Sequence, residues 1–211
     1  MAVAGHKFEN VSDRAAKGQL RKDQRALRTH MRLDHAFVEL LHRRFYGDIR
    51  VSDISRKAGV GRATFYAHYS SKDDLLRSQF RRVVSPMLRP IQSEACPVDA
   101  TALFDHIQSA PRFYKALTQG PNAERGARVM LDCFEERIRQ MPGLNSVDVA
   151  GNLHPDLQRA MVVRFVASSL LAVLECWVEN GSSDSPRDMQ ALFGKLVGNG
   201  ISATRGSDQS R

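Results

Sequence analysis

Apolar residues recur three or four positions apart along most of this 211-residue chain, and no segment alternates apolar with polar residues. Spacings of three and four place side chains on one face of an α-helix, whereas a half-buried strand needs a period of two. The segment from Arg25 to Phe45 shows the helical pattern, and a Tyr-Gly-Asp triplet breaks it. Further helices are predicted at 51–57, 62–69, 98–108, 110–119, 121–141, 155–180 and 185–200, with another running from the Ser70–Asp74 cluster to about Val84. The chain is therefore predicted to be all-α, without β-hairpins.

The positive charge is concentrated in the first part of the chain. Residues 1–83 hold 18 Lys and Arg against 9 Asp and Glu, whereas the remaining residues hold 13 against 14. A one-sided basic block is typical of proteins that bind polyanions, because Lys and Arg neutralise phosphates and release counterions. Charge alone leaves the alternative of a solvated basic surface open.

Composition and helix breakers divide the chain into four segments. Residues 1–22 are polar and aperiodic, which predicts a flexible basic arm. Pro86 and Pro90 mark a break after the fourth predicted helix, because proline disrupts a helix interior. We therefore expect a small N-terminal domain at 23–84, a larger helical domain at 85–204 and a disordered tail at 205–211.

Neither secretion nor membrane insertion is indicated. Cys96, Cys133 and Cys176 are far apart and lack metal-ligand spacing, so reduced thiols are predicted. The N-terminus has no apolar signal-peptide core, and the most apolar stretch, 161–178, contains charged residues that a membrane span rarely holds. We expect a cytoplasmic protein without a membrane partner.

The sequence contains no catalytic or cofactor motif that we could identify. A P-loop, a His-Glu-x-x-His pair and a Gly-x-Ser-x-Gly elbow are all missing. His30 and Asp34 lie one helical turn apart and could share a metal ion, but without further ligands a helix-surface role is favoured. No enzyme activity, no metal and no cofactor is predicted.

The segment 51–69 predicts a helix-turn-helix. Gly59 can adopt the left-handed conformation that ends the first helix and makes the turn. Ser55 is small where the helices would cross, and Phe65 would anchor the second helix from behind. Such a pair of helices can place the second one in the major groove of DNA while the first braces it across the backbone.

The outward positions of the second helix are suited to DNA contacts. Arg62 can donate a bidentate pair of hydrogen bonds to guanine, and Ala63 is small enough to contact a thymine methyl group. The hydroxyl groups of Thr64 and Tyr66 suit phosphate oxygens.

Residues beside this helix complete the predicted interface. Lys72 stands at the start of the next helix, where it suits a phosphate, and Arg50 could reach another. His68 could also reach phosphate, although a lone histidine is more often a surface or packing residue. The predicted DNA-binding set is Arg50, Ser52, Arg62, Ala63, Thr64, Tyr66, His68 and Lys72.

From about Leu33 to Leu76 the sequence resembles the N-terminal domain of TetR-family regulators. The similarity rests on Val51-Ser52-Asp53-Ile54, Ala58-Gly59-Val60, Thr64-Phe65-Tyr66 and Lys72-Asp73-Asp74-Leu75-Leu76. The run 62–66 also resembles a subgroup in which Arg-x-Thr-Phe-Tyr opens the recognition helix. Two positions depart from the family pattern, because Arg50 and Gly61 stand where Ser, Thr or Asn caps are usual. A lost side-chain cap costs about 0.5–2 kcal/mol.

The resemblance implies a homodimer that binds a near-palindromic operator in double-stranded DNA, with a C-terminal domain for ligand binding and dimerisation. The segment 160–181 resembles the penultimate helix of the same subgroup. A repressor that responds to a small-molecule effector, acting in the cytoplasm at the nucleoid, is the expected function. The alternative is an adaptor or co-activator that acts through a protein partner.

Candidate residues for the C-terminal functions come from large apolar and small side chains. The candidate ligand-pocket residues, each of which could equally belong to the core, are Phe104, Phe113, Tyr114, Met130, Phe134, Phe165 and Trp177. The candidate dimer-interface residues are Ala167, Ser168, Leu171, Leu174, Leu192, Phe193 and Leu196. The latter could form a four-helix bundle between subunits, or else pack a core helix within one subunit.

Overall fold

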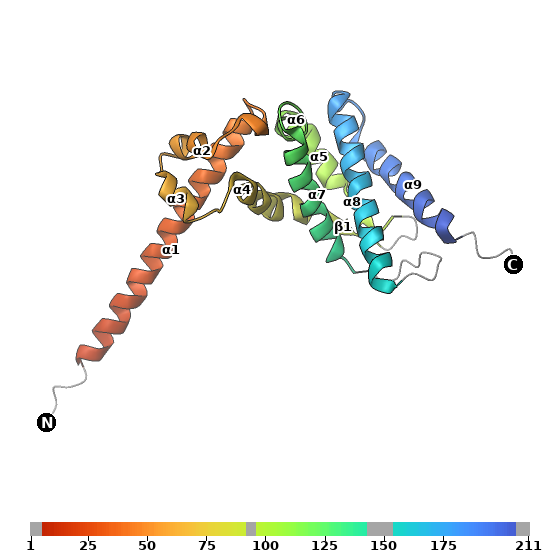
Figure 1. Ribbon diagram of the computed structural model, residues 1–211. Coiled ribbons are helices and arrows are strands. Elements are labelled where there is room, and N and C mark those ends of the chain that lie inside the picture. The colour runs from red at the N-terminus through yellow and green to blue at the C-terminus, as the bar shows by residue number, and fades with distance from the viewer. Residues whose placement is uncertain (1–5, 92–95, 143–153, 206–211) are drawn as a thin grey trace.

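The computed structural model describes residues 6–91, 96–142 and 154–205, and most of them lie in helices (Figure 1). The N-terminal helices are α1 (His6–Leu41), α2 (Val51–Ala58), α3 (Arg62–Tyr66) and α4 (Lys72–Gln79). The C-terminal helices are α5 (Thr101–Ser109), α6 (Pro111–Thr118), α7 (Ala123–Arg139), α8 (Pro155–Glu179) and α9 (Pro186–Arg205). The all-α prediction is confirmed.

One short pair of strands was not predicted. β1 (Arg89–Pro90) pairs antiparallel with β2 (Val98–Asp99), with Arg89 opposite Asp99. The two strands lie on either side of residues 92–95, which are outside the described part of the chain. Each strand has only two residues, which is too short to show an alternating pattern in the sequence.

The N-terminal segment is helical from His6, which the aperiodic sequence of residues 1–22 did not predict. Residues 6–22 form the first turns of α1. Ala, Leu, Lys, Arg and Gln are strong helix formers, and a helix that packs against nothing needs no apolar periodicity. Residues 1–5 lie outside the described part, and so does the predicted tail apart from Arg205, the last residue of α9.

The connection between the two halves of the chain is a helix that changes its winding. The Ser71 hydroxyl accepts a hydrogen bond from the Asp74 backbone N–H at 3.2 Å and so caps α4, which begins within the predicted Ser70–Asp74 cluster. After Gln79 the helix continues as one π-turn, η2 (Phe80–Val84), and then as a 3₁₀ turn, η3 (Ser85–Met87). Pro86 lies in that last turn, where the predicted break falls.

Two pairs of buried aromatic side chains contribute to the packing around the C-terminal helices. Phe104 on α5 packs edge-on against Trp177 on α8, and Phe80 of η2 packs edge-on against Phe134 on α7. Helix α8 is long and apolar enough, by length and composition, to cross a membrane. However, 56% of its apolar window is buried inside the protein, as in the core helix of a bundle.

Candidate nucleic-acid interface

Helices α2 and α3 are joined by a tight turn that α1 holds in place. Gly59 ends α2 with φ of +62°, a conformation that side chains with a Cβ rarely adopt. The Arg32 guanidinium on α1 donates a hydrogen bond from Nη2 to the Gly59 carbonyl oxygen at 3.1 Å. A Cβ at position 59 would lie 2.7 Å from that same nitrogen, so glycine suits both the backbone and the contact.

The N-terminus of α2 is stabilised although its N-cap residue, Arg50, is unusual for the family. Arg50 gives no side-chain cap, in line with its departure from the family pattern. Instead its backbone N–H donates to Asp53 Oδ2 at 3.0 Å, and Arg44 and Arg56 form ion pairs with the same carboxylate. The backbone hydrogen bond from Arg50, followed by the charge of Arg44, holds the pKa of Asp53 below its usual value.

Helix α3 is anchored from behind and exposed in front. Phe65 is completely buried, with Tyr66 at 5.5 Å and Tyr69 at 5.8 Å between ring centroids. Arg62 and Ala63 are exposed, and 52% of Tyr66 is exposed. The structure therefore places a cationic group and a phenol on the outer face of the short helix.

The other predicted contact residues surround this face with different degrees of exposure. Arg50 is exposed, whereas Ser52, Thr64 and His68 are partly buried. All of them lie on α2, α3 or the turns beside them. No observation tests the individual contacts, which remain predictions.

Lys72 is more deeply engaged in the fold than its sequence position suggests. Its ammonium donates hydrogen bonds to the carbonyl oxygens of Tyr46 at 2.6 Å and Ile49 at 2.9 Å. It also lies 4.2 Å from the centre of the Tyr46 ring, and burial lowers its pKa. Since an ammonium has three N–H donors, at most one remains for a phosphate.

We expect Lys72→Met to weaken both folding and DNA binding. Methionine keeps an unbranched stem but removes two charge-assisted hydrogen bonds, which predicts a loss of about 2 kcal/mol in the free energy of unfolding. Loss of one phosphate contact in each protomer would reduce the slope of log affinity against log salt by about 0.9 a protomer, or about 1.8 for a dimer. Urea unfolding and a salt titration with any duplex measure the two effects. Unchanged stability would contradict the buried role of the ammonium.

A polar cluster links the residues just after α3 to α1. The Tyr69 hydroxyl donates to Asp34 Oδ1 at 3.1 Å, and the guanidinium of Arg82 from η2 pairs with Oδ2 of the same residue. The Gln79 side chain donates to the Asp34 carbonyl oxygen at 3.1 Å. His30 lies in the same cluster, 2.7 Å from the Tyr69 hydroxyl. The pair that could have held a metal is thus part of a hydrogen-bonded network, and no group of three potential metal ligands occurs among the described residues.

A series of ion pairs joins α4 and η2 to α7. Asp73, Arg77 and Arg81 recur every fourth residue, so they lie along one face of the helix. Their partners on α7 are Arg125 at 2.9 Å, Asp132 at 3.5 Å and Glu136 at 2.9 Å, in the same order. This charged seam connects the N-terminal helices to the C-terminal helices.

A second contact between the N-terminal and the C-terminal helices needs a glycine. Gly47, in the turn η1 (Tyr46–Asp48), packs so closely on the loop before α7 that a Cβ there would lie 1.8 Å from the Pro121 carbonyl oxygen. The two parts are therefore packed directly together as well as joined by charge.

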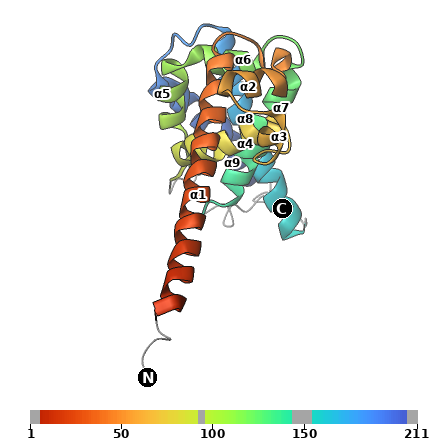
Figure 2. The ribbon, with the colours of Figure 1, turned by 90° about the vertical axis from the view of Figure 1, so that its left-hand side faces the viewer.

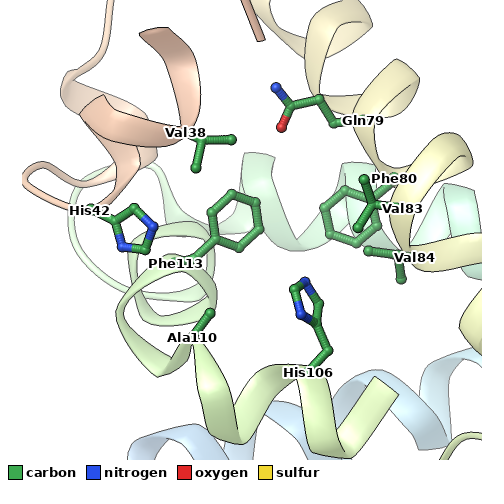
Figure 3. A pocket seen from close by; sticks show the side chains of 9 residues that line it. All are labelled: Val38, His42, Gln79, Phe80, Val83, Val84, His106, Ala110 and Phe113. Atoms are coloured by element: carbon green, nitrogen blue, oxygen red, sulfur yellow. The ribbon is translucent and has the colours of Figure 1, made fainter. Parts of the chain in front are cut away.

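A cavity of about 180 Å³ lies beside the seam, between α1, α4, η2, α5 and α6 (Figure 3). The walls are mainly apolar, and three polar side chains face it, namely His42, Gln79 and His106. Burial lowers the pKa of His106, which favours its neutral form with one donor and one acceptor nitrogen. The remaining lining residues are Val38, Phe80, Val83, Val84, Ala110 and Phe113.

Only one predicted pocket residue lines this cavity. Phe113 does so, whereas Phe165 is 42% exposed on α8. The other five are buried in the core, namely Phe104, Tyr114, Met130, Phe134 and Trp177. The Tyr114 hydroxyl and the Trp177 indole N–H have no hydrogen-bond partner among the described residues. The missed lining residues come from both halves of the chain, so no local pattern could have grouped them.

The predicted dimer-interface residues divide into two sets. Ala167, Leu171, Leu174 and Phe193 are buried within the protomer. Ser168, Leu192 and Leu196 are exposed on α8 and α9. Three apolar residues not predicted for this surface are exposed beside them on α8, namely Leu157, Met161 and Phe165.

A helix pair with a buried anchor, an exposed cationic front and a basic N-terminal half defines a helix-turn-helix DNA-binding protein. Two family models match the chain. Residues 35–78 match the bacterial regulatory proteins of the tetR family, and residues 100–199 match a transcriptional regulator C-terminal region. Together they cover about two thirds of the chain. The chain belongs to the TetR family of transcriptional regulators.

Relatives agree with this assignment. The HTH-type transcriptional regulator YxbF of Bacillus subtilis (strain 168), itself described as uncharacterized, is 32% identical over 100 residues. That match covers 45% of this chain and only 26% of the relative's own length.

Solved structures share the fold. A TetR transcriptional regulator from Streptococcus agalactiae 2603V is 21% identical, with a TM-score of 0.58 over 85% of this chain and 99% of its own. The dihydroxyacetone kinase operon activator DhaS is 18% identical, with a TM-score of 0.52 over 83% and 97%. At these identities the similarity concerns the fold alone.

Proposed function

We propose that the protein is a ligand-responsive repressor that binds a near-palindromic operator as a homodimer. The observation that carries the proposal is the exposed front of α3, with Arg62 and Tyr66 presented by a helix that Phe65 anchors. Two such helices in a symmetric dimer would enter successive major grooves about 34 Å apart. Repression follows when the bound dimer occludes a promoter in the cytoplasmic nucleoid.

The apolar surface of α8 and α9 supports dimerisation through these helices. Leu157, Met161 and Phe165 are spaced four apart on α8, and Leu192 and Leu196 are spaced four apart on α9. Each pattern places its side chains on one helix face. Two copies of this surface related by a twofold axis would bury both faces in a four-helix bundle.

The cavity between the two parts supports an effector response. Its 180 Å³ is comparable to a cavity of about 150 Å³ that accepts benzene, so a small, mainly apolar molecule with one aromatic ring fits. His42, Gln79 and His106 can hydrogen-bond polar groups on such a ring. Because the walls come from the DNA-facing helices and from α5 and α6, occupancy would shift one part relative to the other.

Filling the cavity should imitate an effector. We expect Val38→Phe to lower operator affinity by about 5–150-fold, the usual range of coupling between two sites, without unfolding the protein. Val38→Ala enlarges the cavity and should keep wild-type affinity. Fluorescence anisotropy with a labelled operator measures both. Equal affinity of the Phe variant and the wild type would argue against this cavity as the effector site.

Selection from a random pool of DNA duplexes tests the proposal as a whole. The expected product is an inverted repeat, which would demonstrate sequence-specific binding and twofold symmetry in one experiment. Recovery of no preferred sequence would contradict it. The adaptor alternative is less well supported, because it does not need the exposed Arg62 and Tyr66.

A further inference from the structure

The N-terminal half of α1 extends beyond the rest of the protein. Figures 1 and 2, two views at right angles, both show it projecting past α2 and α3. Every side chain that the structure describes between Ala16 and Arg28 is exposed. This part of the helix therefore adds nothing to the core of the protomer.

Arginines form a stripe along the projecting helix. Arg21, Arg25, Arg28 and Arg32 follow spacings of four, three and four, which at 100° per residue places them within an arc of about 60°. The stripe spans about 16 Å along the helix axis. Leu20, Leu27 and Met31 are also exposed, but they lie roughly 120° away around the helix.

The C-terminal end of the stripe contacts the helix-turn-helix. Its last member, Arg32, donates to the Gly59 carbonyl oxygen in the turn before α3. Two helical turns further along the same face of α1, Glu39 forms an ion pair with Lys57 on α2. The arginines are thus carried on the side of α1 where α2 and its turn pack.

We propose that residues 16–28 of α1 form a second DNA contact, in which Arg21, Arg25 and Arg28 bind phosphates of the duplex flanking each operator half-site. The proposal rests on the proposed function, because it places this stripe on the duplex that α3 reads. Arg21 to Arg28 span about 10 Å of helix axis, and a duplex carries about six phosphate charges on its two strands over that length, so three arginines have phosphates within reach. Guanidinium groups bind phosphates through paired hydrogen bonds.

The test removes the stripe without breaking the helix. In the triple variant Arg21→Gln, Arg25→Gln and Arg28→Gln, glutamine retains a helix propensity close to that of arginine. Its affinity is compared with wild type on two duplexes, one ending at the selected inverted repeat and one extended by about one helical turn on each side. Both are titrated over a range of salt concentrations.

Wild type is expected to bind the extended duplex about tenfold or more tightly than the short one, and the triple variant is expected to lose this preference. With three contacts a protomer and about 0.9 for each, the salt slope of a dimer should fall by up to about 5 on the extended duplex. The base preference should not change, because phosphate contacts carry no direct sequence information. The matched variant Arg112→Gln, Lys115→Gln and Arg187→Gln, in exposed positions of α6 and α9, should bind both duplexes like wild type.

Three results would each overturn the proposal. One is an unchanged salt slope for the triple variant on the extended duplex. The second is an equal loss of affinity on both duplexes, and the third is a change in the sedimentation of the triple variant. Either of these would assign the stripe to another part of the assembly. Failure of the proposed function itself is distinguishable, since wild type would then select no inverted repeat.

Discussion

Replacement of Leu192 and Leu196 by glutamate is expected to convert the protein into a monomer and to reduce operator affinity by about 10²–10⁴-fold. The two leucines are 46% and 51% exposed on α9, so the protomer itself does not need them. In the proposed bundle they are buried, and two carboxylates in that apolar surface would be strongly unfavourable. The affinity falls because a monomer loses the gain from binding two half-sites at once. Sedimentation equilibrium at micromolar concentration and an operator titration measure the two consequences.

A matched pair of substitutions controls for surface charge. Leu20 and Leu27 on α1 are each 60% exposed, and their replacement by glutamate should leave the sedimentation of the dimer unchanged. A wild-type protein that sediments as a monomer and still binds the full operator would exclude the two-half-site arrangement.

Arg62→Ala is expected to lose about 1–3 kcal/mol of binding energy at one base pair of each half-site, and to relax specificity there. Arg62 lies at the first position of α3 and is exposed, so the stability of the fold should not change. Affinities for a set of operators, each changed at one base pair, identify the position that the arginine reads.

The pattern of loss distinguishes the possible roles of Arg62. A loss confined to one position indicates a base contact, whereas a uniform loss across all sequences with a shallower salt dependence indicates a phosphate contact. Arg56→Ala is a suitable comparison, because Arg56 is also exposed but lies on α2 and is paired with Asp53. Wild-type binding by the Arg62 variant would contradict the assignment of α3 as the reading helix.

The helix-turn-helix could be predicted because its determinants are local. The positive φ of Gly59, the burial of Phe65 and the exposure of Tyr66 each follow from positions only a few residues apart. The cap of α4 by Ser71 is equally local. Such features depend on short-range geometry, which the order of residues specifies directly.

The cavity and the dimer surface could not be predicted to the same degree. The cavity is lined from Val38 to Phe113, by segments that only the packing of two domains brings together. Helix α8 is apolar on several faces, so its sequence does not separate Leu171 and Leu174, which face the protomer core, from Phe165, which faces outward. The helix at residues 6–22 was not predicted because we looked for apolar residues at helical spacing. That spacing indicates that a helix packs against something, and a helix can form without it.

One helix touches nearly every functional part of the protein. Over its 36 residues α1 carries the arginine stripe, holds the turn before α3 through Arg32, and brings Val38 to the cavity, with His42 directly after its last residue. A rod of this length measures about 54 Å, so a tilt of about 5° at the cavity end displaces the far end by about 5 Å. That displacement exceeds the 3.4 Å rise of one base pair along a strand. If an effector occupies the cavity as proposed, a molecule the size of a single aromatic ring could tilt α1 and so move its arginines by more than one base pair along the DNA.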